Sequence, residues 1–180
     1  MQYPSYVFAE TLRDGTAVTV RAAGANDGPK IRRAFLNLER DTVYKRFFGY
    51  KADVSDAELG RITRADFERA VALLVTIGAG EDEVVIGGAS YFVSGFVAGA
   101  GRSAELAFTV EEDFQSRGIG SLLMRHIIGI ARVNGLDRLE ADVLSRNRSM
   151  LNVFRRCGLP MAVRHEGDAL HVILSLREAG

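Results

Sequence analysis

The chain has 180 residues, of which 47% are hydrophobic and 26% charged, so it can bury the core of one soluble globular domain. The 23 Lys and Arg residues balance 23 Asp and Glu residues, so the net charge of the chain gives no support for nucleic acid binding. A single cysteine excludes an internal disulfide, and no apolar run approaches the ~20 residues that cross a membrane. The N-terminus lacks a basic start and an apolar core, so we expect a cytoplasmic protein with neither nucleic acid nor membrane partners.

The start of the chain predicts a strand followed by a helix. Residues 1–14 form an expected loose lead-in that ends at the turn signal Asp14-Gly15. Residues 16–21 are rich in β-branched side chains and predict a strand. Residues 25–28 offer an N-cap for a helix from about Pro29, with a buried stripe of Ile31, Ala34, Phe35 and Leu38.

Residues 42–50 combine four aromatic side chains with two cations. The simpler interpretation is the end of a helix packed onto the core, and the alternative is the wall of a ligand site. Just downstream, Ser55 and Glu58 have the spacing of a capping box, which predicts the start of a short helix.

The middle of the chain predicts a hairpin. Residues 70–77 form an apolar run that is typical of a strand buried on both faces. After a turn at residues 78–83, residues 84–93 form the second strand, in which Gly87-Gly88 indicates a bulge or a close backbone approach. Residues 94–103 contain several glycines and are expected to form a mobile loop.

A strand and a helix flank a glycine-containing turn between residues 104 and 135. The strand, residues 104–110, is expected to place Leu106, Phe108 and Val110 on one face and Glu105, Ala107 and Thr109 on the other. A helix with apolar residues at helical spacing begins near Ile119 and stops at Gly135.

The turn itself reads Gln115-Ser116-Arg117-Gly118-Ile119-Gly120. Glycines at the start of a helix let the backbone approach a ligand, and the free N–H groups and the helix dipole there favour a phosphate. The dinucleotide pattern G-x-G-x-x-G and the pattern G-x-x-x-x-G-K-[ST] are both absent. On the glycines alone, a tight turn that serves packing remains the simpler interpretation.

The C-terminal part predicts a strand, a helix and a final hairpin. Residues 138–143 form a strand parallel to residues 104–110 across the intervening helix. Residues 147–157 form a helix that buries Met150, Leu151, Phe154 and Cys157. Residues 161–164 and 170–176 are the final strands, with a turn at residues 166–168.

Two ordered motifs resemble a known family. The pattern Gln115-x-x-Gly118-x-Gly120 after a strand is similar to the acyl-CoA pyrophosphate loop of the GNAT N-acetyltransferases. Residues 147–159 are similar to that family's N-x-x-[AM]-x-x-L-Y-x-x-x-G-F helix. The resemblance implies an α/β fold with a mixed, mostly antiparallel sheet, a splayed parallel strand pair and helices on both faces, in a single domain over residues 1–180. The R-F-F-G phrase at residues 46–49 resembles the acetyltransferase domains of bacterial protein lysine acetyltransferases.

The resemblance also implies acetyl-CoA as the co-substrate. Backbone N–H groups of residues 116–121 would hold the pyrophosphate. The strand around Phe108 would pair with the pantetheine arm and supply an oxyanion donor, and Asn147 matches a pantetheine contact. The complete set of expected cofactor-binding residues is Phe108, Thr109, Val110, Gln115, Ser116, Arg117, Gly118, Ile119, Gly120, Ser121, Asn147, Met150 and Phe154.

An amine acceptor needs a base, because at pH 7 only about one lysine in 2,500 is neutral. Glu105 is the candidate general base, since a charged residue within an apolar strand is costly to bury without a partner. The alternative is a solvated residue near the start of the strand. The A-E-x-A-F phrase resembles the protein acetyltransferases, whose strand glutamate acts as base directly or through water. Phe154 stands where the family often has a tyrosine acid, but a thiolate leaves without one.

The remaining cysteine, histidine and arginine side chains are expected to have structural rather than catalytic or metal-binding roles. Cys157 and His126 are expected to be packing residues on helices. His165 and His171 lack a spacing typical of ligands, so no metal is expected. Three arginines on the helix at residues 147–157 are expected to form a solvated face, and one of them is a candidate for the adenosine 3′-phosphate: Arg148, Arg155 and Arg156.

The leading hypothesis is therefore an acetyl-CoA-dependent N-acetyltransferase in which a primary amine attacks the thioester directly. The acceptor would be a protein lysine, for example on an acyl-CoA synthetase, and the family analogy allows a homodimer. A small-molecule amine acetyltransferase and a non-catalytic acyl-CoA sensor remain as alternatives. The sequence leaves the acceptor, the general acid, the oligomeric state and the regulation open.

Overall fold

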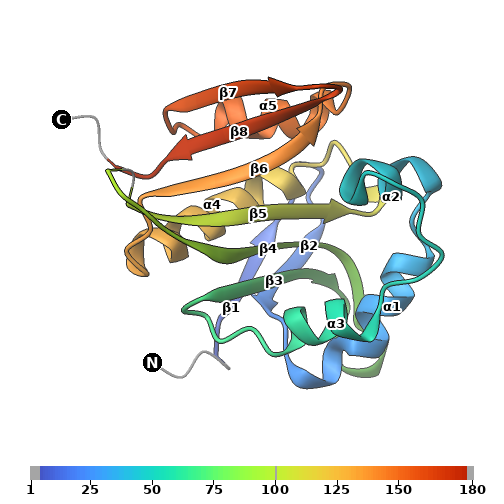
Figure 1. Ribbon diagram of the computed structural model, residues 1–180. Coiled ribbons are helices and arrows are strands. Elements are labelled where there is room, and N and C mark those ends of the chain that lie inside the picture. Colours follow the sequence, from blue (N-terminus) through green and yellow to red (C-terminus); the bar gives the residue numbers. More distant parts are fainter. Residues whose placement is uncertain (1–4, 100, 178–180) are drawn as a thin grey trace.

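The computed structural model describes residues 5–99 and 101–177, which form a mixed eight-stranded sheet (Figure 1). The strands lie in the spatial order β1, β2, β3, β4, β5, β6, β8, β7. Only the pair of β5 and β6 is parallel within the described ranges. The predicted mixed, mostly antiparallel sheet is confirmed. The bounds of the strands are β1 Val7–Thr11, β2 Ala17–Ala22, β3 Ala70–Ile77, β4 Val84–Val97, β5 Gly101–Val110, β6 Arg138–Leu144, β7 Met161–Glu166 and β8 Ala169–Ser175.

Helices cover both faces of the sheet, as predicted (Figure 1). The helices α4 and α5 pack on one face, α1 and α3 pack on the other, and α2 lies beside the end of β5 (Figure 1). Among the residues that the structure describes, no helix is long and apolar enough to cross a membrane. The helices are α1 Gly28–Leu36, α2 Arg40–Phe47, α3 Asp56–Thr63, α4 Ile119–Val133 and α5 Arg148–Arg156, with short 3-10 turns at Ala25–Asp27, Gly80–Asp82 and Glu112–Phe114.

Buried apolar clusters lie on both sides of the sheet, and β3 contributes to each side. Val71 and Val75 pack into the larger cluster under α4 and α5. Ala72 and Leu74 alternate with them and pack into a smaller cluster under α1 and α3. A central strand must be apolar on both faces, so the prediction for residues 70–77 is confirmed.

The expectation of a loose lead-in over residues 1–14 is wrong for residues 7–11, which form β1 along the edge of β2. The strand is anchored by polar contacts to α4. The hydroxyl of Tyr6 lies 2.7 Å from Nδ1 of His126, and Oε1 of Glu10 lies 3.0 Å from Nε2 of the same ring. His126 is buried, which confirms that it is a hydrogen-bonded packing residue. Residues 1–4 lie outside the described part of the chain.

The expected loop over residues 94–103 is also wrong, because β4 continues to Val97 and β5 begins at Gly101. A register irregularity falls between Val93 and Gly95, and Gly95 has a φ of 141° that side chains rarely adopt. The glycine therefore allows a bulge within a long hairpin. Composition alone made this bulge look like the start of a loop.

Several short sequence patterns predicted the local structure correctly. The capping box of α3 is present, with Glu58 N donating to Ser55 Oγ at 3.2 Å and Ser55 N donating to Glu58 Oε2 at 2.9 Å. In β4 the register shifts beside Gly87, and a Cβ on Gly88 would lie 2.9 Å from the carbonyl oxygen of Leu73. The glycine pair thus marks both a bulge and a close backbone approach, as predicted.

Candidate active site

The parallel strands β5 and β6 pair over a short distance and then separate. Their register joins Ser103 to Arg138, Ala104 to Leu139 and Glu105 to Glu140. Beyond this point β5 continues beside β4 to Val110, while β6 continues beside β8. The later residues of β5 therefore have no neighbouring strand on the β6 side, and the predicted splayed pair is confirmed.

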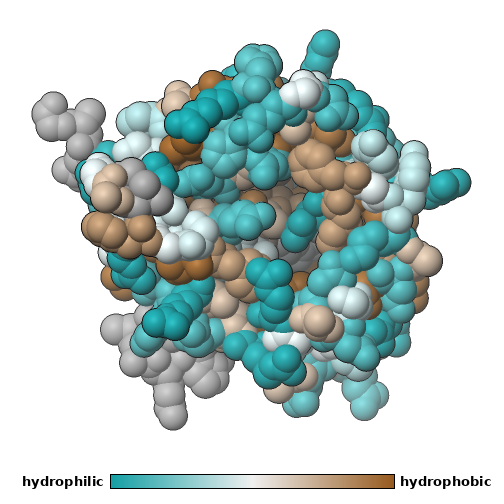
Figure 2. All heavy atoms as spheres, viewed as in Figure 1, coloured by the Kyte–Doolittle hydropathy of each residue, from teal (hydrophilic) through white to brown (hydrophobic). Residues whose placement is uncertain are grey.

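A cleft of about 380 Å³ occupies the gap between these strands. Its walls come from β5, β6, the start of α4, α5 and one side of α2. Figure 2 shows a hollow near the centre of the face that it presents, bordered by both hydrophilic and hydrophobic side chains.

Most of the predicted site residues meet in this cleft. The members of the predicted set that line it are Glu105, Phe108, Thr109, Val110, Gln115, Ser116, Ile119, Gly120, Asn147, Met150 and Phe154. Arg117, Gly118 and Ser121 do not line it. Arg117 is instead held by Asp14 at 3.0 Å, and its guanidinium lies over the ring of Phe114.

The turn before α4 has the geometry of an anion-binding helix start. Gly118 adopts a φ of 94° and Ser116 a φ of 64°, so the chain reverses sharply before α4 begins at Ile119. The first N–H groups of a helix have no intrahelical acceptor, and the helix dipole makes this end positive. A Cβ on Gly120 would lie 3.0 Å from Cγ2 of Val153, so a glycine lets α4 and α5 approach closely here.

Side chains of the turn and of α5 hold the cleft walls in place. Nε2 of Gln115 donates to the carbonyl oxygen of Val110 at 3.0 Å and to Oγ1 of Thr42 at 3.2 Å. Gln115 thus connects the end of β5 with α2. Asn147 caps α5, because its Oδ1 accepts a hydrogen bond from the N–H of Met150 at 3.3 Å.

The aromatic segment at residues 42–50 both packs onto the core and lines the cleft. On one side of α2, Val43 is buried and the ring of Phe47 meets Phe35 with centroids 5.7 Å apart. On the other side, Lys45 and Arg46 line the cleft. The segment is therefore a helix packed onto the core that also forms a wall of the site.

Glu105 and Arg46 both line the cleft, and their opposite charges interact. Glu105 is exposed and lines the cleft where β5 leaves β6. Burial lowers the pKa of the Arg46 guanidinium, while the carboxylates of Glu105 and Glu58 counteract this effect. Arginine remains charged at neutral pH, so the cleft contains a carboxylate and a desolvated cation.

Phe154 offers no proton donor at the position of the family's tyrosine. The side chain is buried, with 1% of its surface exposed, and it meets Phe108 in an edge-to-face contact with centroids 6.0 Å apart. Cys157 on the next turn is half-buried, and burial raises the pKa of its thiol. Both side chains belong to the packing between α5 and the sheet.

The sequence analysis missed a polar cluster on β6 and β8. His171 lies with Nδ1 2.7 Å from Asp142 and Nε2 3.0 Å from Glu140, and these hydrogen bonds raise the pKa of the imidazole. Asp142 lines the cleft, and Glu140 is the register partner of Glu105. The alternation of Glu140 and Asp142 along one strand was a signal for this cluster in the sequence. The sequence did not show that β8, which carries His171, pairs with that strand. Within the described ranges, no group of His, Cys, Asp or Glu side chains could hold a metal ion.

Relatives of this chain are acetyltransferases by name. An acetyltransferase of Pseudomonas aeruginosa is 27% identical over 166 residues, which cover 92% of this chain and 87% of that protein. The acetyltransferase Pat of Mycolicibacterium smegmatis is 31% identical over 147 residues, which cover 82% of this chain. The match spans only 42% of the length of Pat.

Solved structures share the fold. The GNAT domain of S. lividans PAT superposes with a TM-score of 0.85 at 29% identity, covering 97% of this chain and 99% of that domain. A putative acetyltransferase of Salmonella typhimurium, solved with acetyl-CoA, has a TM-score of 0.70 over 92% of this chain and 97% of that one, and its 20% identity supports the fold alone.

A family model described as the acetyltransferase (GNAT) family matches residues 34–159. This range includes α2, β5, the turn before α4, β6 and α5, which together build the cleft. By this match and by the shared architecture, the chain belongs to the GNAT acetyltransferase family.

Proposed function

We propose that the protein is an acetyl-CoA-dependent N-acetyltransferase that acts on a primary amine, with a protein lysine as the acceptor. One observation carries the proposal. A single cleft joins the positive start of α4, the unpaired side of β5 and the exposed carboxylate of Glu105. Phosphate binding, thioester binding and deprotonation of an amine each require one of these features.

The cofactor would lie along β5. The backbone of residues 108–110 has no strand neighbour on the β6 side, so it can pair with the amides of the pantetheine arm as a strand would. The pyrophosphate would meet the N–H groups of residues 116–121. Asn147, Met150 and Phe154 line the opposite wall and would enclose the arm.

The reaction follows from these positions. A protonated amine gives one proton to Glu105, and the neutral nitrogen attacks the carbonyl carbon of the thioester. A backbone N–H of β5 stabilises the oxyanion. The C–S bond then breaks, the amide nitrogen loses its second proton, and the CoA thiolate takes up a proton from solvent. The balance is an ammonium and a thioester converted into an amide, a thiol and one proton.

The acceptor side of the cleft suits a cation. Glu105 and Asp142 line the cleft, and Glu140 lies beside Glu105 across the two strands. Glu105 and Asp142 would attract a lysine ammonium at neutral pH, while Lys45 and Arg46 line the α2 wall of the same cleft.

The similarity to Pat and to the S. lividans PAT domain supports an acetyltransferase. A protein acceptor, such as an acyl-CoA synthetase, is proposed from the resemblance of residues 46–49 and of the strand around Glu105 to bacterial protein lysine acetyltransferases. A cytoplasmic location is proposed from the single cysteine, which suits a reducing compartment, and a homodimer and a single domain over residues 1–180 are proposed from the family resemblance.

A thiol-release assay tests the proposal. Acetyl-CoA would be supplied with a panel of lysine-containing proteins, lysine peptides, polyamines and aminoglycosides, and mass spectrometry would locate any added 42-Da group. Acetylated lysines on a folded protein would support the proposal, while turnover restricted to small amines would favour the small-molecule alternative. Tight acetyl-CoA binding without any turnover would favour the sensor and contradict the proposal.

A further inference from the structure

Phe48, at the end of α2, has an unusual backbone conformation. Its φ of 57° and ψ of 26° lie in the left-handed helical region, and its N–H donates to the carbonyl oxygen of Tyr44 at 2.8 Å. Glycine usually takes this position after a helix, because a side chain there is strained. Gly49 is the next residue, yet Phe48 and not Gly49 has the positive φ. Such strain at a bulky residue is uncommon and clusters at functional sites.

The left-handed turn gives two neighbouring phenylalanines different surroundings. Phe47 packs onto α1, with its ring centroid 5.7 Å from that of Phe35. The charged groups of Arg46 and Lys51 lie 4.7 and 4.6 Å from the centre of the Phe47 ring. Phe48 instead lines the cleft with 41% of its surface exposed. A glycine would end the helix with less strain and without an exposed apolar ring, so helix capping alone does not account for Phe48.

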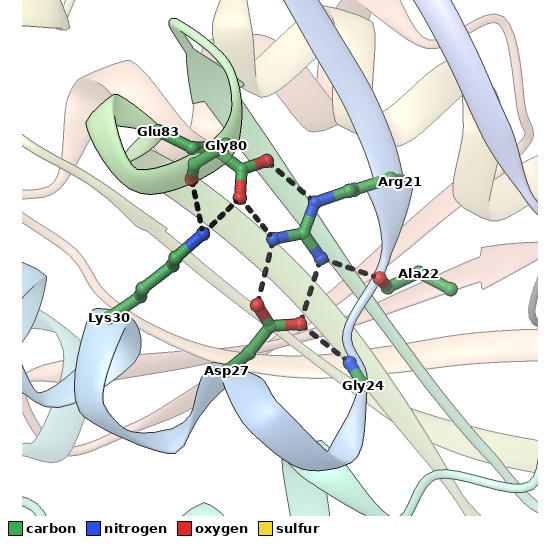
Figure 3. A network of polar contacts seen from close by, with 7 residues as sticks. All are labelled: Arg21, Ala22, Gly24, Asp27, Lys30, Gly80 and Glu83. Atoms are coloured by element: carbon green, nitrogen blue, oxygen red, sulfur yellow. Dashed lines mark hydrogen bonds and ion pairs between the residues drawn. The ribbon is translucent and has the colours of Figure 1, made fainter.

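The helix α1, on which Phe47 packs, is itself fixed to the sheet. Arg21 on β2 binds Asp27 and Glu83 at 2.8 Å, and Lys30 on α1 binds Glu83 at 2.6 Å (Figure 3). These ion pairs hold the start of α1 against β2 and the turn before β4. The end of α2 therefore packs on a support that is held in place by several contacts.

The helix α2 runs along the cleft from its phosphate end towards its acceptor end. Near the start of the helix, Oγ1 of Thr42 accepts a hydrogen bond from Gln115 of the turn before α4 at 3.2 Å. Near its end, the charge of Arg46 interacts with that of Glu105. A helix rises about 1.5 Å per residue, so Phe48 lies about 9 Å along α2 from Thr42. Phe48 is therefore at the end of the cleft where the acceptor amine would meet Glu105.

We propose that Phe48 determines the acceptor specificity, because its ring packs against the alkyl stem of a lysine while the ammonium reaches Glu105. The inference rests on the proposed function, which places the acceptor amine at Glu105. A lysine stem packs along apolar surface while its charged head stays among polar groups. Asp142, on the β6 side of the cleft, would attract the same head. The substrate class is thus a primary amine on an unbranched alkyl chain, and an amine fixed on a sugar ring would gain little from Phe48.

Steady-state kinetics at saturating acetyl-CoA test this inference. The acceptors are three short capped peptides that differ in one side chain: lysine, ornithine or diaminobutyrate. Each of these side chains has one methylene group fewer than the one before it. Each methylene that packs against Phe48 should lower KM by about fourfold, so the lysine peptide should have the lowest KM.

Phe48→Ala removes the proposed contact. It should raise KM for the lysine peptide by about tenfold, leave kcat within about twofold and narrow the difference between the lysine and diaminobutyrate peptides to less than about threefold. Phe48→Leu keeps an apolar side chain and should stay within about threefold of the unmodified protein. Phe96→Ala removes another exposed phenylalanine, on β4 and outside the cleft lining, and should preserve KM and the ranking.

Phe48→Gly separates acceptor recognition from folding. Glycine adopts a positive φ without strain, so the midpoint of urea denaturation should equal that of the unmodified protein or rise. KM for the lysine peptide should nevertheless increase as it does in Phe48→Ala. A lower midpoint together with an unchanged KM would show that Phe48 only packs the end of α2, and would overturn the inference.

The remaining outcomes separate the two proposals. If Phe48→Ala leaves KM for a lysine acceptor within about twofold, the role of Phe48 is overturned and the proposed function stays intact. A preference for lysine that Phe48→Ala does not narrow would show that reach selects the stem, which also overturns the role of Phe48. No turnover with any peptide, protein or small amine would overturn both proposals. If only folded proteins are acetylated, the same variants are compared on such a protein, and a KM about tenfold higher in Phe48→Ala is again the expected result.

Discussion

Glu105 on β5 and Glu140 on β6 are the last residues that these two parallel strands pair. Immediately beyond them the strands separate and the cleft opens. The point of divergence thus coincides with the carboxylate that is proposed to accept a proton. Glu140 is ion-paired with Arg138 at 2.7 Å and lies 3.0 Å from His171, so Glu105 is the carboxylate of this pair that an incoming ammonium would meet in the cleft.

Glu105→Gln should lower kcat/KM for a lysine acceptor by about 100- to 1,000-fold at pH 7, because an amide cannot take the proton. The loss should narrow as the pH rises, since the neutral fraction of a lysine grows about tenfold per pH unit below its pKa of ~10.4. The pH–rate profile measures this effect. Glu68→Gln, an exposed site before β3, is the matched control. A uniform loss at all pH values would argue against general-base catalysis.

Phe154→Tyr restores a hydroxyl at the family's usual position. Because a thiolate is a good leaving group, kcat should change by less than about threefold. Transient kinetics of thiol release would detect a difference. A gain of more than about tenfold would show that protonation of the thiolate limits the rate, contrary to the proposed mechanism.

Glu83 should contribute an acid-sensitive part of the stability. The hydrogen bonds from Arg21 and Lys30 lower the pKa of Glu83 from 4.5 to about 2. Its contribution is therefore complete above pH 4.5 and is lost as the pH falls from there towards about 2.

Glu83→Gln should accordingly lower the free energy of unfolding by about 2 kcal/mol at pH 7 and by much less at pH 3. Urea denaturation at both pH values provides the comparison. Glu81→Gln changes an exposed carboxylate in the same turn and should have little effect. A loss of unfolding free energy in Glu83→Gln that is the same at both pH values would contradict the proposed role of the Glu83 charge.

Tyr6→Phe tests whether the segment before β1 stabilises the fold. It removes the hydroxyl that lies 2.7 Å from Nδ1 of the buried His126, and the expected loss is about 1 kcal/mol of unfolding free energy. Tyr50→Phe makes the same change at an exposed residue. If both variants unfold at the same urea concentration as the unmodified protein, the contact contributes nothing measurable.

Local patterns predicted the parts of the site that are continuous in sequence. The strand, the glycine turn and the helix at residues 104–135 follow from alternation, glycine placement and helical spacing, and the structure confirms all three elements. The capping box at Ser55 was equally predictable, because it requires only residues within one helical turn.

The remaining features depend on long-range pairing. The residues of β1 form a strand because β2 offers an open edge and α4 offers His126 as a partner. Asp142 joins the cleft because β6 and β5 separate, which no single segment reveals. The left-handed backbone of Phe48 likewise depends on the packing of α2 against α1, so it could be found only in the folded chain.

The central claim is that the cleft binds acetyl-CoA through the start of α4, and calorimetric titration with acetyl-CoA tests it most directly. Gly118→Asp adds a negative charge to the turn before α4 that would hold the pyrophosphate, with the new Cβ 3.2 Å from Nε of Arg13. Gly167→Asp makes the same change at another glycine with positive φ, in the turn between β7 and β8, with no atom near the added Cβ. Saturable binding that Gly118→Asp abolishes and Gly167→Asp retains is the predicted result. Absence of binding to the unmodified protein, or equal binding to both variants, would contradict the claim.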